Sequence, residues 1–310
     1  MSGVTIVQIK KEDDGMRLNR WFLKYYPGLS LSRLNKLLRT KQIKLDGGKV
    51  EASCKLSQGQ ELRLPPLDNE KVMSLKKDFV SKKDEVFIQS LVIYKDENIL
   101  ALNKPSGLAV QGGTNTNRHV DGMLEALKFD ALEKPKLVHR IDKNTSGLLL
   151  LARNRKFAEL LTQAFKNHNL QKTYLALCYG KPKLNQGEIN LSLSKVGEKI
   201  VPDPQGQKAI TLYRVLDSVG TKFSLLELSP LTGRTHQIRV HLSAIGCPIV
   251  GDDKYFDRQN TKLNIFDDKL HLHAYKINLS DLYNKKMVIT AELPDYFKQS
   301  LANSGIVFKE

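Results

Sequence analysis

Apolar positions at helical spacing mark two helices near the start of the chain. In the first helix they recur at i, i+3, i+4 and i+7, as Leu18, Trp21, Phe22 and Tyr25. This helix is predicted to end near Pro27 and Gly28. Ser30 or Ser32 can cap a second helix, whose inward face carries Leu34, Leu37 and Leu38. Alternating apolar residues then predict short strands around the turn at 46–48 and up to residue 64, so residues 13–65 form a compact unit of two helices and strands.

The pattern changes after residue 86, where strand-like apolar runs outnumber helices. Eight runs have strand character: 92–94, 99–102, 148–152, 173–179, 209–215, 223–228, 272–277 and 287–291. A helix is predicted over residues 157–165, and a second one begins in the basic segment 234–241 and ends at Gly246. Residues 183–208 alternate weakly and predict only short strands and loops. Because strands and helices do not alternate one for one, residues 86–300 are predicted to form an α+β domain with a mixed, mostly antiparallel sheet.

The charge distribution separates these two units. The whole chain carries a formal net charge of +16, which favours a polyanionic partner such as nucleic acid, although a basic surface alone is the simpler explanation. Residues 1–65 hold 13 Lys and Arg against 6 Asp and Glu, a disproportionate share of the excess. Residues 66–85 hold five of each sign with little periodic apolar content, which is typical of a linker.

Cysteine usage and hydropathy indicate a cytoplasmic protein. The three cysteines, Cys54, Cys178 and Cys247, are odd in number and far apart, which suits a reducing compartment. The first thirty residues show no signal-peptide core, and no apolar run approaches the ~18 residues that span a bilayer. We therefore expect no membrane partner.

One aspartate stands out as a candidate for chemistry. Asp142 follows Arg140 and precedes a Thr-Ser-Gly turn, and an apolar run at 148–152 lies behind it. A carboxylate in that pattern is held at a loop tip and is open to a substrate. Taken alone, however, an Asp beside a turn is more often a turn cap.

The N-terminal unit resembles the S4 RNA-binding domain, in which the second helix and the following turn lie against RNA. The resemblance covers about fifty residues. It implies RNA contacts for the basic residues of that helix and turn, Arg33, Lys36, Arg39 and Lys41. Lys41 stands where the S4 family usually has Gly, and Asp46 where it usually has Asn. An ordinary solvated helix face would also carry such charges.

Five motifs in residues 90–295 resemble the RluA family of large-subunit ribosomal RNA pseudouridine synthases, and the appended S4-like unit narrows the resemblance toward the synthase C type. In chain order the motifs are NKPSG at 103–107, HRIDKNTSG at 139–147, KTYLA at 172–176, TGRTHQIRVH at 232–241 and GCPIVGD at 246–252. The resemblance implies isomerisation of uridine to pseudouridine in large-subunit rRNA or its assembly intermediate, with no metal or organic cofactor. We expect a monomer, because RNA can bridge the two units.

The resemblance also implies a role for each site residue. Asp142 is the catalytic carboxylate, acting as nucleophile or base, and the Arg234 guanidinium would orient it and lower its pKa. Tyr174 would stack on the base and pass a proton. Arg140 would fill the space of a flipped base or hold a phosphate, and Arg239 would bind RNA.

Other interpretations stay open at this point. Tyr174 in a strand is by default a packing residue, and Arg234 could bind only phosphate. Four histidines, at 236, 241, 271 and 273, suggest zinc but lack a metal-ligand spacing. A non-catalytic rRNA-binding or ribosome-assembly protein would need only the basic charge and the S4-like unit. A hydrolase would need a second carboxylate, which no motif places beside Asp142.

Overall fold

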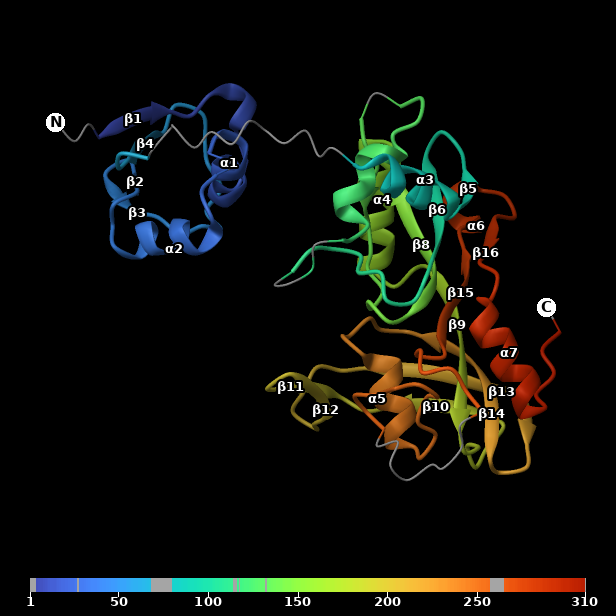
Figure 1. Ribbon diagram of the computed structural model, residues 1–310. Coiled ribbons are helices and arrows are strands. Elements are labelled where there is room, and N and C mark those ends of the chain that lie inside the picture. The colour runs from blue at the N-terminus through green and yellow to red at the C-terminus, as the bar shows by residue number, and fades with distance from the viewer. Residues whose placement is uncertain are drawn as a thin grey trace. The chain divides into compact units, whose positions relative to one another are not determined.

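The computed structural model describes residues 4–26, 28–67, 80–113, 116, 118–131, 133–256 and 265–309. The chain divides into two compact units, Met1–Phe79 and Val80–Glu310 (Figure 1). Among the described residues, no helix is both long and apolar enough to cross a membrane. Each unit has its own hydrophobic core.

The N-terminal unit packs two helices against a small sheet. Helices α1 (Leu18–Tyr25) and α2 (Leu31–Arg39) bury the apolar faces that their spacing predicts. Ser30 caps α2, its Oγ accepting a hydrogen bond from the Arg33 amide at 3.2 Å. The antiparallel sheet has the order β1-β4-β2-β3, formed by β1 (Thr5–Gln8), β4 (Glu61–Leu64), β2 (Lys44–Leu45) and β3 (Gly48–Lys49). Strand β1 lies before residue 13, and its mostly exposed residues give no alternation from which to predict it.

The last residues of the predicted linker 66–85 belong to a helix. Helix α3 (Lys82–Ser90) begins within it, because Ser81 caps the helix and Asp84 and Glu85 lie in its first turn. Ser81 Oγ accepts from the Asp84 amide at 3.1 Å. Residues 68–79 lie outside the described residues.

The second unit is an α+β domain built on one mixed, mostly antiparallel sheet, as predicted. Its strand order is β10-β13-β14-β9-β15-β8-β6-β5, with β16 beside β15 and β7 beside β8. The strands are β5 (Val92–Lys95), β6 (Ile99–Lys104), β7 (Lys136–Leu137), β8 (Ser146–Ala152), β9 (Gln171–Tyr179), β10 (Gln186–Asn190), β13 (Ile210–Val219), β14 (Phe223–Pro230), β15 (Leu272–Asn278) and β16 (Val288–Thr290). A hairpin of β11 (Leu193–Val196) and β12 (Lys199–Pro202) forms a separate ribbon.

Helices cover this sheet in two groups. Beside β6 and β8 lie α3, the 3-10 helix η3 (Asp121–Leu127) and α4 (Arg155–Lys166), which share one core. Beside β9 and β14, α5 (Gln237–Ala244) and α7 (Asp295–Ser304) pack into two further cores. A short helix, α6 (Ser280–Tyr283), follows β15.

Strand β15 joins the two parts of the sheet. It pairs with β9 antiparallel and with β8 parallel, the latter only through His273 with Ser146 and Ala274 with Gly147. A Cβ at Gly147 would lie 2.3 Å from the Ala274 carbonyl oxygen, so only glycine allows this approach. The start of β8, and with it the loop that carries Asp142, is thereby fixed against β15.

Candidate active site

A cleft of about 790 Å³ lies where the loop before β8, strand β9 and the segment before α5 meet. It brings together the five site residues predicted in this unit, Arg140, Asp142, Tyr174, Arg234 and Arg239. These residues are up to 99 positions apart in the chain, and the sheet order places them around one cleft.

The loop that carries Asp142 is held through its backbone. The Thr145 amide donates to the Asp142 carbonyl at 3.2 Å, and the Gly107 amide donates to the Lys143 carbonyl at 2.9 Å. Among the described residues, no hydrogen bond to the Asp142 carboxylate from the turn at 145–147 is found. The side chain of Asp142 is 31% exposed and lines the cleft, so it does not act as a simple turn cap.

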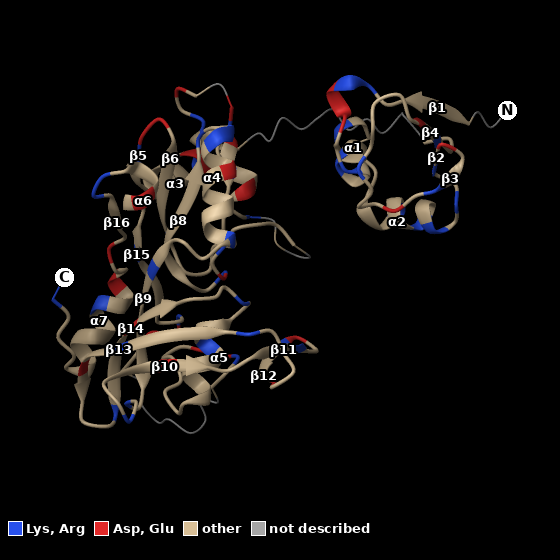
Figure 2. Cartoon of the chain, turned by 180° about the vertical axis from the view of Figure 1, so that it is seen from behind, with Lys and Arg blue, Asp and Glu red and all other residues tan. Residues whose placement is uncertain are grey.

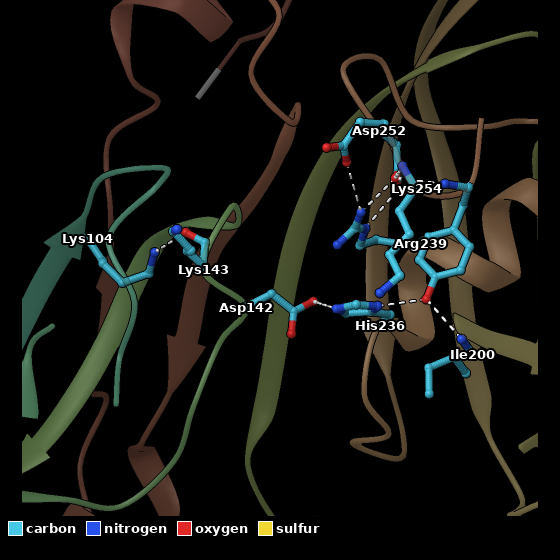
Figure 3. Close-up of polar contacts among 10 residues, drawn as sticks. Lys104, Asp142, Lys143, Ile200, His236, Arg239, Asp252 and Lys254 are labelled. Atoms are coloured by element: carbon cyan, nitrogen blue, oxygen red, sulfur yellow. Dashed lines mark hydrogen bonds and ion pairs between the residues drawn. The ribbon is translucent and has the colours of Figure 1, made fainter. Parts of the chain in front are cut away.

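Lys104 reinforces this loop from inside the protein. The residue is fully buried at the end of β6, and its Nζ donates to the carbonyls of Pro105, Leu108 and Lys143 at 3.0, 2.8 and 3.0 Å. Burial lowers the pKa of Lys104 to about 7, and the negative charge of Asp142 opposes that shift. Lys104 therefore ties the neighbour of Asp142 to the end of β6 (Figure 3).

His236 faces Asp142 from the opposite side of the cleft (Figure 3). Its Nε2 lies 3.9 Å from Asp142 Oδ2, and its Nδ1 lies 2.7 Å from the Tyr255 hydroxyl. Burial is the main cause that lowers the pKa of His236, and the charge of Asp142 acts against it. The ring is therefore neutral near pH 7.

Arg239 is the guanidinium whose charge interacts with Asp142. Burial alone would lower the pKa of Arg239, but its hydrogen bonds to Asp252 and the charges of Asp252 and Asp142 together raise it. The side chain is almost fully buried and donates to both Asp252 oxygens. Arg239 was predicted to bind RNA, yet the structure places it beneath the cleft, fixed by Asp252, and not on an open surface.

Arg234, which was predicted to pair with Asp142, has other partners. Its Nε donates to the Lys208 carbonyl at 3.2 Å, and its amide donates to Gln237 Oε1 at 3.0 Å. In the described part of the chain, no ion pair joins Arg234 to Asp142. The physical reason is that α5 begins at Gln237 and not at Arg234, so residue 239 lies in its first turn while residue 234 lies in the preceding loop.

Tyr174 packs in the core of the domain and also lines the cleft, the two positions that the sequence left open for it. It is half-buried in β9, packs against two hydrophobic cores and also lines the cleft. Burial, with the negative charge of Asp142, raises the pKa of its hydroxyl well above the usual range. The phenol thus stays protonated and can donate a proton or a hydrogen bond.

Three of the four histidines once considered for zinc have both ring nitrogens hydrogen-bonded to protein groups. His241 contacts Thr211 and the Leu191 carbonyl. His271 contacts the Val250 carbonyl and the Ser300 hydroxyl. His273 contacts the Ser146 hydroxyl and the Ala291 carbonyl. The ring nitrogens of these three histidines therefore hold neighbouring segments of the domain together by hydrogen bonds.

The basic residues predicted on the N-terminal unit form one exposed face, which we call the α2 basic face: Arg33, Lys36, Arg39 and Lys41. Basic positions lie along α2 and the β2–β3 hairpin of this unit (Figure 2). No salt bridge engages these four side chains within the described ranges. Lys41 has φ 57° and Asp46 has φ 49°, so both residues adopt the left-handed conformation that Gly and Asn favour.

Sequence reasoning missed Lys104, His236, Tyr255 and Asp252. Lys104 lay in the quoted motif at 103–107, but nothing in that motif predicts that its amine is buried and holds the Asp142 loop. Asp252 and His236 also lay inside quoted motifs. Their spacing, however, does not predict that Asp252 binds Arg239 or that His236 has φ 52°.

The chain is similar to known proteins over most of its length. Residues 98–244 match the family model described as RNA pseudouridylate synthase. The chain is 39% identical over 295 residues to "Ribosomal large subunit pseudouridine synthase C" of Rickettsia bellii, covering 91% of this chain and 96% of that protein. It is 34% identical to the protein of the same name from Vibrio vulnificus, covering 89% of each chain.

A solved structure shares the fold. "Human RNA Pseudouridylate Synthase Domain Containing 4" superposes with a TM-score of 0.63 at 28% identity, covering 73% of this chain and 98% of that chain. The family model, the relatives that match most of the chain and the shared fold all indicate the same family. The chain therefore belongs to the RNA pseudouridylate synthase family.

Proposed function

We propose that the protein isomerises specific uridines of large-subunit ribosomal RNA to pseudouridine, with Asp142 as the catalytic carboxylate. The observation that carries this proposal is the position of Asp142, whose carboxylate lies in the cleft among Tyr174, His236 and Arg239. The names of the Rickettsia and Vibrio relatives support the class of RNA.

The chemistry fits these groups. Pseudouridine formation breaks the glycosidic N–C bond, turns the uracil and forms a C–C bond, so no electron or atom has to come from outside. Asp142 would attack the substrate or remove a proton, and Arg239 holds a positive charge close enough for the Asp142 charge to raise the pKa of its guanidinium. The Tyr174 ring can lie against the uracil, and its protonated hydroxyl can donate a hydrogen bond to the base.

We assign the orienting role to Arg239 and not to Arg234. Arg239 is fixed by two hydrogen bonds to Asp252, whereas Arg234 contacts a backbone carbonyl in the loop before α5. Arg234 stays at the rim of the cleft, where it can contact a phosphate of the RNA.

RNA binding would use both units. A uridine inside folded RNA has to leave its stack to reach Asp142, and the exposed Arg140 beside it can occupy the vacated space or hold a phosphate. The α2 basic face would contact the RNA backbone, as its exposure and lack of salt bridges among the described residues support. We propose that residues 13–65 act as an S4-like RNA-binding unit.

The test is a map of pseudouridine in large-subunit rRNA from cells that lack the protein, after complementation with wild type, Asp142→Asn or Asp142→Ala. We expect wild type to restore pseudouridine at discrete uridines, and both variants to leave them unmodified. Asp121→Asn, an exposed aspartate outside the cleft, is the matched control and should restore modification. If wild type and Asp142→Ala leave the same uridines unmodified, the protein is the non-catalytic rRNA-binding alternative.

A further inference from the structure

His236 adopts a backbone conformation that its neighbours in α5 do not share. It has φ 52° and ψ 18°, in the left-handed region, directly before the first residue of the helix. This conformation is unfavourable for an L residue, and His is one of the few side chains that tolerate it. The side chain makes no hydrogen bond that caps α5, so capping does not account for the conformation.

The conformation directs the two ring nitrogens at two different groups. Nε2 lies 3.9 Å from Asp142 Oδ2, and Nδ1 lies 2.7 Å from the Tyr255 hydroxyl. The ring edge of His236 also meets the Tyr255 ring, with centroids 5.5 Å apart and planes at 77°. One imidazole therefore spans the distance from the segment after α5 to the carboxylate in the cleft (Figure 3).

Tyr255 can act as the donor to His236. Its hydroxyl accepts a hydrogen bond from the Ile200 amide in β12 at 3.2 Å. The phenol proton is free to point at His236 Nδ1, and in that tautomer Nδ1 is the acceptor and the ring proton lies on Nε2. Nε2 is the nitrogen that faces Asp142.

Tyr255 itself is held firmly. Its amide donates to Asp252 Oδ1 at 3.1 Å, its carbonyl accepts from Ser243 Oγ at 2.9 Å, and the Arg239 guanidinium lies 5.1 Å from its ring centroid. The carboxylate that fixes Arg239 thus also fixes the residue that orients His236.

We propose that His236 is a positioning residue for the catalytic carboxylate: its Nε2–H aligns one oxygen of Asp142 and leaves the other oxygen free for the uridine. The inference rests on the proposed function and deepens it. At 3.9 Å the contact is longer than a hydrogen bond, and substrate binding closes it, as is common for catalytic hydrogen bonds in ligand-free enzymes. The charged groups around the ring are Asp142, Arg239, Lys254 and Asp252.

Two substitutions separate positioning from a structural role. Asn tolerates the left-handed backbone well and its amide reaches the position of Nδ1, so His236→Asn keeps the Tyr255 contact and loses the one to Asp142. Gln tolerates that backbone less well, but its amide reaches about as far as Nε2. In single-turnover reactions with saturating substrate RNA, we expect His236→Asn to be slowed at least tenfold and His236→Gln to recover part of the rate. RNA affinity should change less than twofold in both.

A purely structural role gives the opposite order, with His236→Asn near wild type and His236→Gln impaired, and that result overturns the proposal. Thermal melting of both variants checks that they fold. A rate loss that disappears when the RNA concentration is raised to saturation would also overturn it, because positioning acts on the bound complex.

A measurement without catalysis separates this inference from the proposed function. The ring of His236, followed by NMR in full-length protein labelled at histidine, should titrate at lower pH in Asp142→Asn than in wild type, because the Asp142 charge raises its pKa. An unchanged titration in an active enzyme overturns the positioning role alone. A shifted titration in a wild type that makes no pseudouridine overturns the proposed function, and the positioning role with it.

Discussion

Arg239 and Asp252 form a buried ion pair in which Nε and Nη2 of the guanidinium donate to the two carboxylate oxygens at 2.8 and 2.6 Å. Their side chains are 5% and 1% exposed. A planar, two-bond pair of this kind fixes the direction of the guanidinium as well as its place. It therefore defines where positive charge stands relative to Asp142.

Replacing Arg239 by Lys should slow the reaction more than replacing Arg234 by Lys. Lysine keeps the charge but cannot form both bonds to Asp252, so its position relative to Asp142 is lost. We expect at least a tenfold fall in the single-turnover rate for Arg239→Lys and a loss of about 1–3 kcal/mol in the free energy of unfolding. Single-turnover assays and urea denaturation measure both. A greater rate loss in Arg234→Lys would contradict the assignment of Arg239.

Lys104→Met should destabilise the protein and slow the reaction together. Methionine fills similar space but leaves the carbonyls of Pro105, Leu108 and Lys143 without their donor. We expect a loss of roughly 2–3 kcal/mol in unfolding free energy, as for buried groups left unsatisfied. The exposed Lys156→Met is the control and should match wild type in both assays. Full activity in Lys104→Met would show that the Asp142 loop does not depend on this anchor.

Acidification should destabilise the fold through His273. Burial lowers its pKa to about 4, whereas the unfolded chain binds this proton near pH 6.5. Between these values the unfolded state holds more protons, so lowering the pH favours unfolding. His273 alone should contribute a loss of about 2 kcal/mol between pH 7.5 and pH 5. Urea denaturation of wild type and His273→Gln at both pH values measures it, and an equal pH dependence in the two proteins would rule out this source.

Gly147→Ala should destabilise the junction of β8 and β15. The new methyl group would meet the Ala274 backbone at a position where φ is also +104°. We expect a loss of at least about 2 kcal/mol in unfolding free energy. Gly113→Ala, where a Cβ has no neighbour within 4 Å, is the matched control and should change stability little. Equal stabilities of the two variants would mean that β8 can move away from β15.

Neutralising the α2 basic face should weaken RNA binding and reduce its dependence on salt. The change combines Arg33→Gln, Lys36→Gln and Arg39→Gln, and each lost phosphate contact should reduce the slope of log K against log salt by about 0.7–0.9. A salt titration of rRNA-fragment binding measures this, and deletion of residues 1–65 should reduce the slope further. The control neutralises three exposed lysines of the other unit, Lys181, Lys183 and Lys222. Identical slopes for the two triple variants would assign the effect to net charge alone.

Periodic segments were predictable from the sequence because one face of each is buried. The apolar spacing in α1, α2 and α4 located these helices, and the strand runs indicated a mixed sheet. The residues predicted from the motifs all line the same cleft. Which of Arg234 and Arg239 lies beneath the cleft was not predictable, because both belong to one basic segment and only the start of α5 at Gln237 decides it. The φ of His236 depends likewise on tertiary contacts with Tyr255 and Asp142.

The place of β15 in the sheet has a consequence for the order of events during synthesis. Asp142 precedes β8 and Tyr174 lies in β9, yet these strands flank β15 and meet only through it. Domains fold as their segments leave the ribosome, and pairing between distant strands comes late. A growing chain therefore has no complete cleft until residues 272–278 have emerged from the ribosome, however early Asp142 and Tyr174 were made.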